Sequence, residues 1–344
     1  MKILLALFLT SLILAGCSST KDVYFDIPVE LKTPVNKAEF LSKYSQYISG
    51  RKIFLDPGHG GNDRNNTGYN GIAVEADLNL HVALALRDYL EEAGAVVIMS
   101  RVKDTTVNLK DRSTLANASG AELFISIHHN APGDHNDDWT NYTSTYFHAK
   151  DVNFEYEPCN HDIAKYIQRD LAYAMRNSGG LGSFDGTYSD YMIYPGQGFS
   201  VLRLSKIPAV LVECGFNTHH FEARRLVLDE FNEIEAWGIF RGLCRYYRSG
   251  IPQIKMITKD SLRADDNLKV SFSIVDSLGI EPNDFKIQLD TTKVEDYAFE
   301  ASTGILNVGL PNGTLGEHVI RIIAVNKNGN HSFPFYKKIN VLKE

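Results

Sequence analysis

Between residues 52 and 247 the chain alternates short apolar runs with longer segments in which apolar residues recur every three or four positions. The runs predict strands, and the spacing predicts amphipathic helices. The expected strands are 53–55, 95–99, 123–127 and 209–213, and the expected helices are 76–90, 109–118, 161–175 and 231–246. Fully apolar strands that alternate with helices predict an α/β domain with a mostly parallel central sheet flanked by helices on both faces.

After residue 250 the pattern changes to short runs with a period of two. Residues 268–274 and 285–289 alternate strictly, and further runs follow to residue 341, separated by turn signals such as Asn328-Gly329. This spacing predicts a C-terminal all-β sandwich of immunoglobulin-like type. It contains no cluster of titratable residues, so we expect no catalysis there.

The first residues resemble a bacterial lipoprotein signal. Lys2 precedes the apolar run 3–14, which is too short to span a bilayer, and the segment closes on Cys17. The resemblance implies cleavage before Cys17, acylation of that cysteine, and an exported protein anchored to the bacterial envelope. Ser18 resembles the signal for the outer membrane in two-membrane bacteria. An ordinary secretory signal with an incidental cysteine is the alternative.

The chain of 344 residues is long enough for two domains. The expected division is a signal peptide at 1–16, a tether with one short helix at 17–47, the α/β domain at 48–250 and the sandwich at 251–344. The formal net charge of −7 provides no basic surface, so no nucleic-acid partner is expected.

Three cysteines remain after Cys17, and an odd number cannot all pair. They are Cys159, Cys214 and Cys244, and their spacing matches no zinc motif. Cys214 lies within an apolar strand, which favours core packing over a role as nucleophile.

Four side chains suited to metal or proton chemistry follow apolar runs or begin a helix. His59 follows the first strand, Glu75 precedes the first helix, and His128 follows the third strand. Two histidines and one carboxylate suit an open zinc site, with a fourth position left for water. Considered alone, Glu75 is better interpreted as a carboxylate that the helix dipole favours at the start of a helix. Together with the two histidines, it is better interpreted as a metal ligand. Glu213 ends an apolar strand, and a zinc hydrolase needs such a carboxylate to move protons.

Neighbouring polar residues have less defined roles. Asp56 is expected either to hydrogen-bond an imidazole nitrogen or to cap the turn before His59. His129 should point away from His128, because successive residues of a strand face opposite sides. Asn130 is expected to orient a ligand or contact substrate.

These segments resemble the zinc-dependent N-acetylmuramoyl-L-alanine amidases of the AmiC-like family, amidase type 3. The resemblance covers about residues 52 to 247. Its motifs are Ile-Phe-Leu-Asp-Pro-Gly-His at 53–59, Ser-Arg-Val-Lys-Asp at 100–104 with Arg112, Leu-Phe-Ile-Ser-Ile-His-His-Asn at 123–130, and Pro-Ala-Val-Leu-Val-Glu-Cys-Gly-Phe at 208–216. It implies one α/β domain that cleaves the amide between N-acetylmuramic acid and the L-alanine of the stem peptide in peptidoglycan.

The resemblance also implies residue roles. One Zn²⁺ ion would be held by His59, Glu75 and His128. Glu213 would act as general base and general acid. Supporting or substrate-contacting roles are expected at Asp56, Asn130 and Arg112.

Two departures from the family pattern concern substrate recognition. The family continues Leu-Ser-Asn after Phe216, whereas this chain has Asn-Thr-His-His at 217–220. The insert at 131–147 is longer and more aromatic than is common, and residues 179–198 form a similar segment. Such loops are typical of lids, substrate walls or variable surface excursions. The sequence leaves these alternatives open, and also whether the insert holds an autoinhibitory helix.

Three functions fit the sequence. The first is the amidase, the second a zinc amidohydrolase or peptidase acting on another cell-wall amide, and the third a non-catalytic wall-binding protein. The presence of all four key residues favours an enzyme. The expected partners are peptidoglycan, a membrane through Cys17, and a protein activator or wall ligand for the C-terminal domain.

Overall fold

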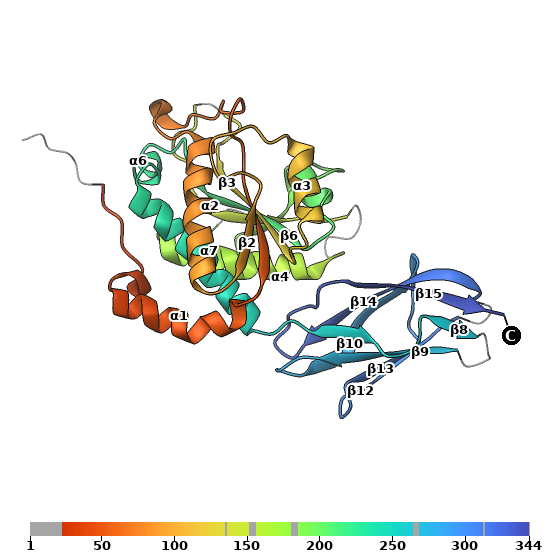
Figure 1. Cartoon of the computed structure of the whole chain (residues 1–344). Helices are drawn as coiled ribbons and strands as arrows, with labels where there is room; N and C mark the ends of the chain where they lie inside the picture. Colours follow the sequence, from red (N-terminus) through yellow and green to blue (C-terminus); the bar gives the residue numbers. More distant parts are fainter. Residues whose placement is uncertain are drawn as a thin grey trace, which may run out of the picture.

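The computed structural model of the chain describes residues 23–134, 136–150, 156–179, 185–263, 268–311 and 314–343. The expected signal peptide, Cys17 and the first residues of the expected tether lie outside these ranges. The described chain forms a mixed α/β unit and an all-β unit that follows it (Figure 1).

A six-stranded sheet forms the middle of the α/β unit. Its strands are β1 (Lys52–Pro57), β2 (Val96–Met99), β3 (Leu123–Asn130), β4 (Ser144–Phe147), β5 (Thr187–Ser189) and β6 (Ala209–Phe216). The strand order is β2-β1-β3-β6-β4-β5. All neighbouring pairs are parallel except β4 and β6, which agrees with the predicted mostly parallel sheet.

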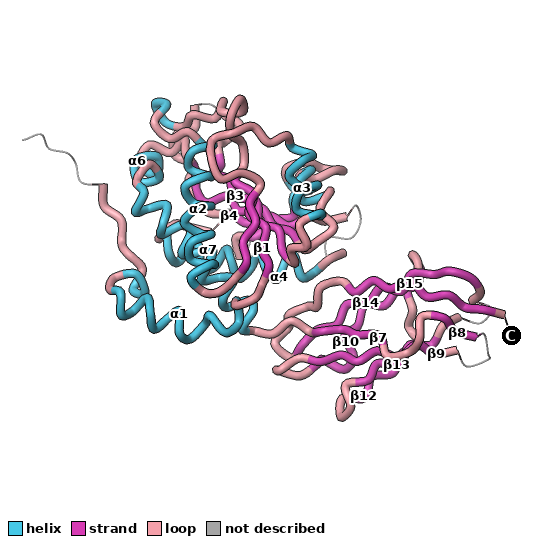
Figure 2. The backbone as a smooth tube through the Cα atoms, viewed as in Figure 1, coloured by secondary structure: helices cyan, strands magenta, loops and turns pink. Residues whose placement is uncertain are grey.

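Helices cover both faces of this sheet, as predicted (Figure 2). One face carries α2 (Glu75–Glu92), α4 (Pro158–Met175) and α7 (Asp229–Arg248), and the other carries α3 (Leu109–Ala118) and α5 (Ser200–Arg203). Ile53 and Leu55 of β1 enter the core on the first side, whereas Phe54 enters the core on the second side. Because alternate residues meet opposite, equally buried faces, the strands are apolar throughout.

Short helical segments connect these elements. They are η1 (Val29–Leu31), η2 (Tyr69–Gly71), η3 (Asp190–Met192) and α6 (Glu222–Leu226).

Part of the expected tether is a packed helix. Residues 34–48 form the 15-residue helix α1 (Pro34–Ile48), which packs against α7. Thr33 caps this helix, because its side-chain oxygen accepts a hydrogen bond from the amide of Asn36. The buried residues of the helix are Phe40, Tyr44 and Ile48. These three residues, spaced by four, attach the segment to the α/β unit.

The two segments expected as loops also contain regular structure. Strand β4 occupies the end of the insert 131–147, and β5 and η3 lie within 179–198. The insert contains no helix among its described residues, so the expected alternative of an autoinhibitory helix finds no support there.

The C-terminal unit contains two mostly antiparallel sheets, which pack around a hydrophobic core of their own. Its strands are β7 (Gln253–Met256), β8 (Ser261–Arg263), β9 (Lys269–Val275), β10 (Ile280–Leu289), β11 (Thr292–Lys293), β12 (Tyr297–Glu300), β13 (Ile305–Gly309), β14 (Gly316–Asn326) and β15 (Phe335–Leu342). The orders are β11-β10-β14-β15-β8 and β12-β13-β9-β7. Among the described residues, no helix is both long and apolar enough to cross a membrane.

Specific hydrogen bonds join the two units. Asn330 donates its side-chain amide to the carbonyl of Gly250 at 3.0 Å, and the amide of His331 donates to Asp162 of α4 at 2.8 Å. These hydrogen bonds attach the C-terminal unit to the α/β unit, on the side of helix α4.

Candidate active site

The candidate active site lies at the carboxyl ends of the parallel strands β1, β3 and β6. His59 follows β1, His128 lies near the end of β3, Glu213 lies in β6, and Glu75 begins α2. All four line one cleft of about 660 Å³. This position is expected, because ligands of open parallel sheets bind beyond the carboxyl ends of the strands.

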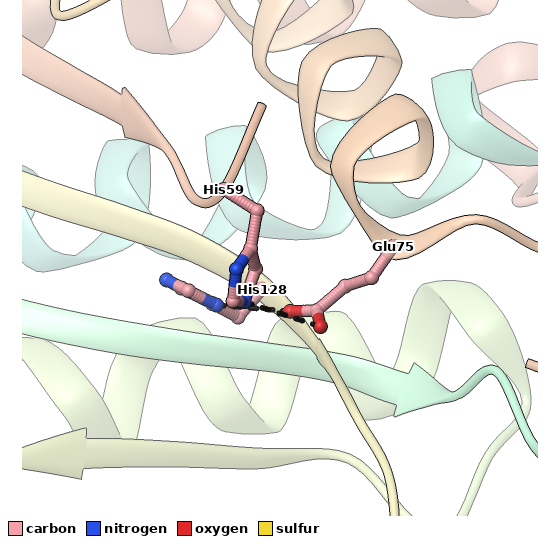
Figure 3. Close-up of side chains that lie close together, drawn as sticks. All are labelled: His59, Glu75 and His128. Carbon is pink, nitrogen blue, oxygen red and sulfur yellow. Dashed lines mark hydrogen bonds and ion pairs between the residues drawn. The ribbon is translucent and has the colours of Figure 1, made fainter. Parts of the chain in front are cut away.

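His59, Glu75 and His128 converge around a common point (Figure 3). Nε2 of His59 lies 3.2 Å from Oε2 of Glu75, and Nδ1 of His128 lies 2.9 Å from Oε1 of the same carboxylate. One ligand atom from each residue lies within 4.8 Å of the others. Two imidazoles and a carboxylate at this spacing fit the donor set of a catalytic zinc ion.

The contacts among the three residues keep Glu75 ionised. Burial acts to raise the pKa of Glu75, but hydrogen bonds from His128 and His59 outweigh it and hold the pKa well below its usual range. The hydrogen bond with Glu75 is the main reason that the pKa of His59 rises to about 9. The carboxylate is therefore anionic at neutral pH, as a metal ligand must be.

The loop that carries His59 is held by Arg112 of α3. The guanidinium donates to the carbonyl oxygens of Pro57 and His59, at 2.7 and 2.8 Å. It also forms a buried ion pair of 2.7 Å with Asp56. Arg112 thus fixes the backbone on both sides of Gly58.

Among the described residues, the hydrogen-bond partners of the Asp56 carboxylate are an arginine and two serines, so the expected hydrogen bond to an imidazole finds no support there. Its carboxylate instead accepts hydrogen bonds from the hydroxyl groups of Ser100 and Ser126, at 2.6 and 2.9 Å, in addition to Arg112. Nδ1 of His59 pairs with Asp63, at 2.8 Å. Asp56 lies within β1, whose two faces are both covered, so its side chain is buried in the interior.

Gly58 is required by the position of His128. A Cβ atom built on Gly58 would overlap the imidazole ring of His128. The strand end can therefore approach the candidate ligand only with glycine at this place.

Two asparagines that the sequence interpretation missed support Glu75. Asn66 donates to Oε2 at 2.8 Å, and Asn79 donates to Oε1 at 3.4 Å. Asn79 follows Glu75 by four residues on α2, which places both side chains on one face of the helix. That spacing was the available signal, whereas nothing in the local sequence identifies Asn66.

His129 faces away from the candidate metal ligands, as the strand geometry predicted. Its Nδ1 lies 2.8 Å from Oδ1 of Asn79, and its Nε2 lies 3.0 Å from Oε1 of Glu235 on α7. Cys214 lies close to this buried pair. Burial is the main reason that the pKa of Cys214 lies well above the usual range of a thiol.

Glu213 lies beside His128 in the pairing of β6 with β3. Burial, followed by the charge of Glu75, raises its pKa well above the usual range. Within the described residues, its buried Oε2 has no hydrogen-bond partner. A buried carboxylate oxygen without a partner is costly unless a ligand or substrate uses it.

Asn130 also lines the cleft, but its side chain has a local role. Its Oδ1 accepts a hydrogen bond from the amide of Ala131 at 2.8 Å, and its carbonyl accepts one from the amide of Asn217 at 3.1 Å. These bonds shape the end of β3 and join it to the segment after β6.

Comparison with known proteins agrees with this arrangement. A family described as N-acetylmuramoyl-L-alanine amidase matches residues 53–245. The germination-specific N-acetylmuramoyl-L-alanine amidase of Bacillus subtilis is 34% identical over 220 residues, which cover 59% of this chain and 83% of the relative. An N-acetylmuramoyl-L-alanine amidase structure from Clostridium difficile 630 matches with 30% identity and a TM-score of 0.50, covering 58% of this chain and 98% of its own.

A more distant structure shares the fold. Ami1 of Mycobacterium smegmatis matches with 20% identity and a TM-score of 0.51, covering 59% of this chain and 99% of its own. The family match spans more than half of the sequence and includes every residue of the candidate site. The chain therefore belongs to the type 3 family of N-acetylmuramoyl-L-alanine amidases.

Proposed function

We propose that this protein is a zinc-dependent peptidoglycan hydrolase that cleaves the amide between N-acetylmuramic acid and L-alanine. The observation that carries the proposal is the convergence of His59, Glu75 and His128 in one cleft with Glu213, whose Oε2 has no hydrogen-bond partner in the part of the chain that the structure describes. Family membership supplies the substrate class.

The chemistry divides between the ion and the protein. Zinc bound by His59, Glu75 and His128 would supply a Lewis acid that polarises the amide carbonyl and lowers the pKa of a water molecule. Glu213 accepts the proton of the attacking water at Oε2 and then donates it to the departing alanine nitrogen. Burial and the charge of Glu75 raise the pKa of Glu213, which makes its carboxylate a stronger base than an exposed glutamate.

Replacement of Glu213 by glutamine tests this assignment. We expect Glu213→Gln to retain zinc, measured by elemental analysis, and to lose about 10²- to 10⁴-fold in turnover on purified peptidoglycan. Mass spectrometry of the wild-type products should show free stem peptides that begin with L-alanine. Glu317→Gln, an exposed substitution in the C-terminal unit, is the matched control.

Two outcomes would overturn the proposal. Undiminished turnover by Glu213→Gln would remove the proposed base. Cleavage at another amide would replace the amidase by a zinc peptidase or amidohydrolase.

We also propose that Cys17 is acylated and anchors the protein to the bacterial envelope. The support is the lipoprotein-like signal at the start of the sequence. The substitution Cys17→Ser should move the protein from the membrane fraction to the soluble fraction of the cells that express it. Retention in the membrane fraction would contradict the anchor.

For the C-terminal unit we propose an immunoglobulin-like fold. Its two sheets and shared core support this assignment. An experimental structure with a different strand connectivity would refute it.

A further inference from the structure

Five aromatic side chains gather on loops beside the catalytic cleft. They are Tyr69, Trp139, His219, His220 and Phe221, and we call this group the aromatic shelf. Trp139 and Phe221 are 70% and 61% exposed, respectively. Exposed large rings that cluster, rather than occur singly, mark a binding surface.

His220 is the centre of the aromatic shelf. Its ring centroid lies 4.3 Å from that of Trp139 and 4.1 Å from that of Phe221, and it stacks on His219 at 4.9 Å. The ring centroid of Tyr69 lies 6.1 Å from that of His220. The rings therefore form one continuous surface assembled from three separate segments of the chain.

Hydrogen bonds hold the aromatic shelf in this arrangement. The amide of Trp139 donates to the carboxylate of Asp137 at 3.0 Å, which also accepts from Thr140. The carbonyl of Asp138 accepts from the amide of His220 at 3.3 Å. The insert and the segment after β6 are thus bound to each other, so the two exposed rings do not depend on a loose loop for their position.

The aromatic shelf is structurally continuous with the candidate metal site. The carbonyl of Asn217 accepts from the amide of Tyr69 at 2.9 Å, and its side chain donates to Oδ1 of Asn66 at 3.1 Å. Asn66 in turn donates to Glu75 at 2.8 Å. Two side chains therefore connect the aromatic shelf to a metal ligand. The start of α2 and the helix α6, which follows Phe221, lie at the same end of the domain (Figure 1).

The chemistry of the aromatic shelf fits an uncharged, flat ligand with apolar C–H faces. Partial burial and then the neighbouring His220 lower the pKa of His219, so this ring is neutral at neutral pH. Sugar rings present such faces to aromatic side chains, which combine an apolar ring with a polar edge. The proposed scissile amide joins a sugar to a peptide, so a sugar residue must lie beside the metal site whenever the amide reaches it.

We propose that the aromatic shelf binds N-acetylated sugar rings of the glycan strand next to the cleaved muramic acid, an inference that rests on the proposed function. Three of its five rings, those of Trp139, His219 and His220, come from the insert 131–147 and the segment 217–220, where the sequence departs from the pattern of the family. It therefore provides glycan recognition particular to this chain.

Tryptophan fluorescence of the full chain tests the proposal. The sequence contains two tryptophans, of which Trp237 is fully buried and Trp139 is exposed. A ligand that binds on the shelf should therefore change the fluorescence emission of Trp139. A β-1,4-linked N-acetylglucosamine hexamer should change the emission saturably, and Trp139→Phe should abolish the change. No change with the hexamer, or a change with the free stem peptide alone, would overturn the proposal.

A second measurement separates recognition from catalysis. Trp139→Ala and Phe221→Ala should each weaken sedimentation with peptide-free glycan strands about tenfold, whereas Trp139→Phe should retain most binding. Tyr24→Ala, which removes an 85% exposed ring from the N-terminal segment, is the control and should bind normally. Equal binding by all variants would refute the role of the shelf.

The proposed function has an independent readout. Hydrolysis of a small N-acetylmuramoyl dipeptide by the wild type and by the control Tyr24→Ala tests the amidase without the shelf, because this substrate contains no neighbouring sugar. If neither protein hydrolyses this substrate while both still bind glycan strands, the proposed amidase activity is contradicted and the role of the shelf remains supported. Normal hydrolysis without glycan binding would contradict the shelf and leave the amidase supported.

Discussion

Replacing Glu235 by alanine removes the carboxylate that hydrogen-bonds Nε2 of His129 in the interior of the α/β unit. The distance is 3.0 Å, and both side chains are 0% exposed. The other carboxylate oxygen accepts from Asn232 at 2.9 Å. In the variant, the imidazole loses this partner in a fully buried part of the interior.

The expected loss of stability follows from this burial. Removing one partner of a buried pair costs about 3–5 kcal/mol, because the remaining polar group keeps its desolvation penalty. For a unit of roughly 200 residues, about 3 kcal/mol corresponds to a fall in Tm of about 6–12 °C. Glu235→Gln should lose less, because its amide oxygen still accepts a hydrogen bond.

The same substitution should weaken zinc binding. His129 also contacts Asn79, which donates to the proposed ligand Glu75. Loss of groups that orient metal ligands typically costs about 10- to 100-fold in metal affinity. Glu235→Ala is therefore expected to lower both stability and zinc affinity, although it lies on a helix that does not line the cleft.

Thermal unfolding of the metal-free protein and zinc titration against a chelator measure the two effects. Glu233→Ala is the matched control, because Glu233 is exposed on the same helix two residues earlier. Equal Tm values and equal zinc affinities for the two variants would refute the structural role of the buried pair.

The remaining predictions concern the ligands and the cysteine. Gly58→Ala should displace the imidazole of His128 and lower zinc affinity at least about tenfold, measured by chelator competition; unchanged affinity would contradict the steric argument. Because the pKa of metal-free His59 is about 9, zinc must displace its proton, so affinity should rise about tenfold per pH unit between pH 7 and 9 and then level off. A flat profile would show that His59 is already neutral. Cys214 is buried with a raised pKa, so the folded protein should resist its alkylation and Cys214→Ser should remain active; rapid labelling with loss of turnover would reveal a nucleophile.

The sequence predicted the central part of the fold because its signals were local and strong. β1, β3 and β6 are buried on both faces, so each is a continuous apolar run. Strands β4 and β5, which lie at one end of the sheet order, were missed because their residues are largely Ser, Thr and Tyr, which resemble loop composition. Helix α1 was underestimated because packing against α7, rather than its own sequence, supplies most of its stability.

The candidate site was predictable where one strand end carried one decisive residue. His59 and His128 each follow an apolar run, and the structure brings both to Glu75. The groups that support this ligand lie far away in sequence, and Glu235 is 106 positions from its partner His129. An isolated carboxylate on a helix has no sequence signal that distinguishes a buried partner from a solvated surface charge.

Environment separates the roles of three acidic residues that have similar intrinsic chemistry. Asp56 forms an ion pair with an arginine and accepts hydrogen bonds from two hydroxyl groups, so its role is structural. Glu75 lies between two imidazoles, with its pKa held low, and so presents a fixed negative charge for a cation. Glu213 has a raised pKa and an oxygen without a partner in the described part of the chain, so it is the carboxylate able to exchange a proton in the cleft. A hydrolytic site needs the second and third of these states side by side, and the pairing of β3 with β6 provides this proximity.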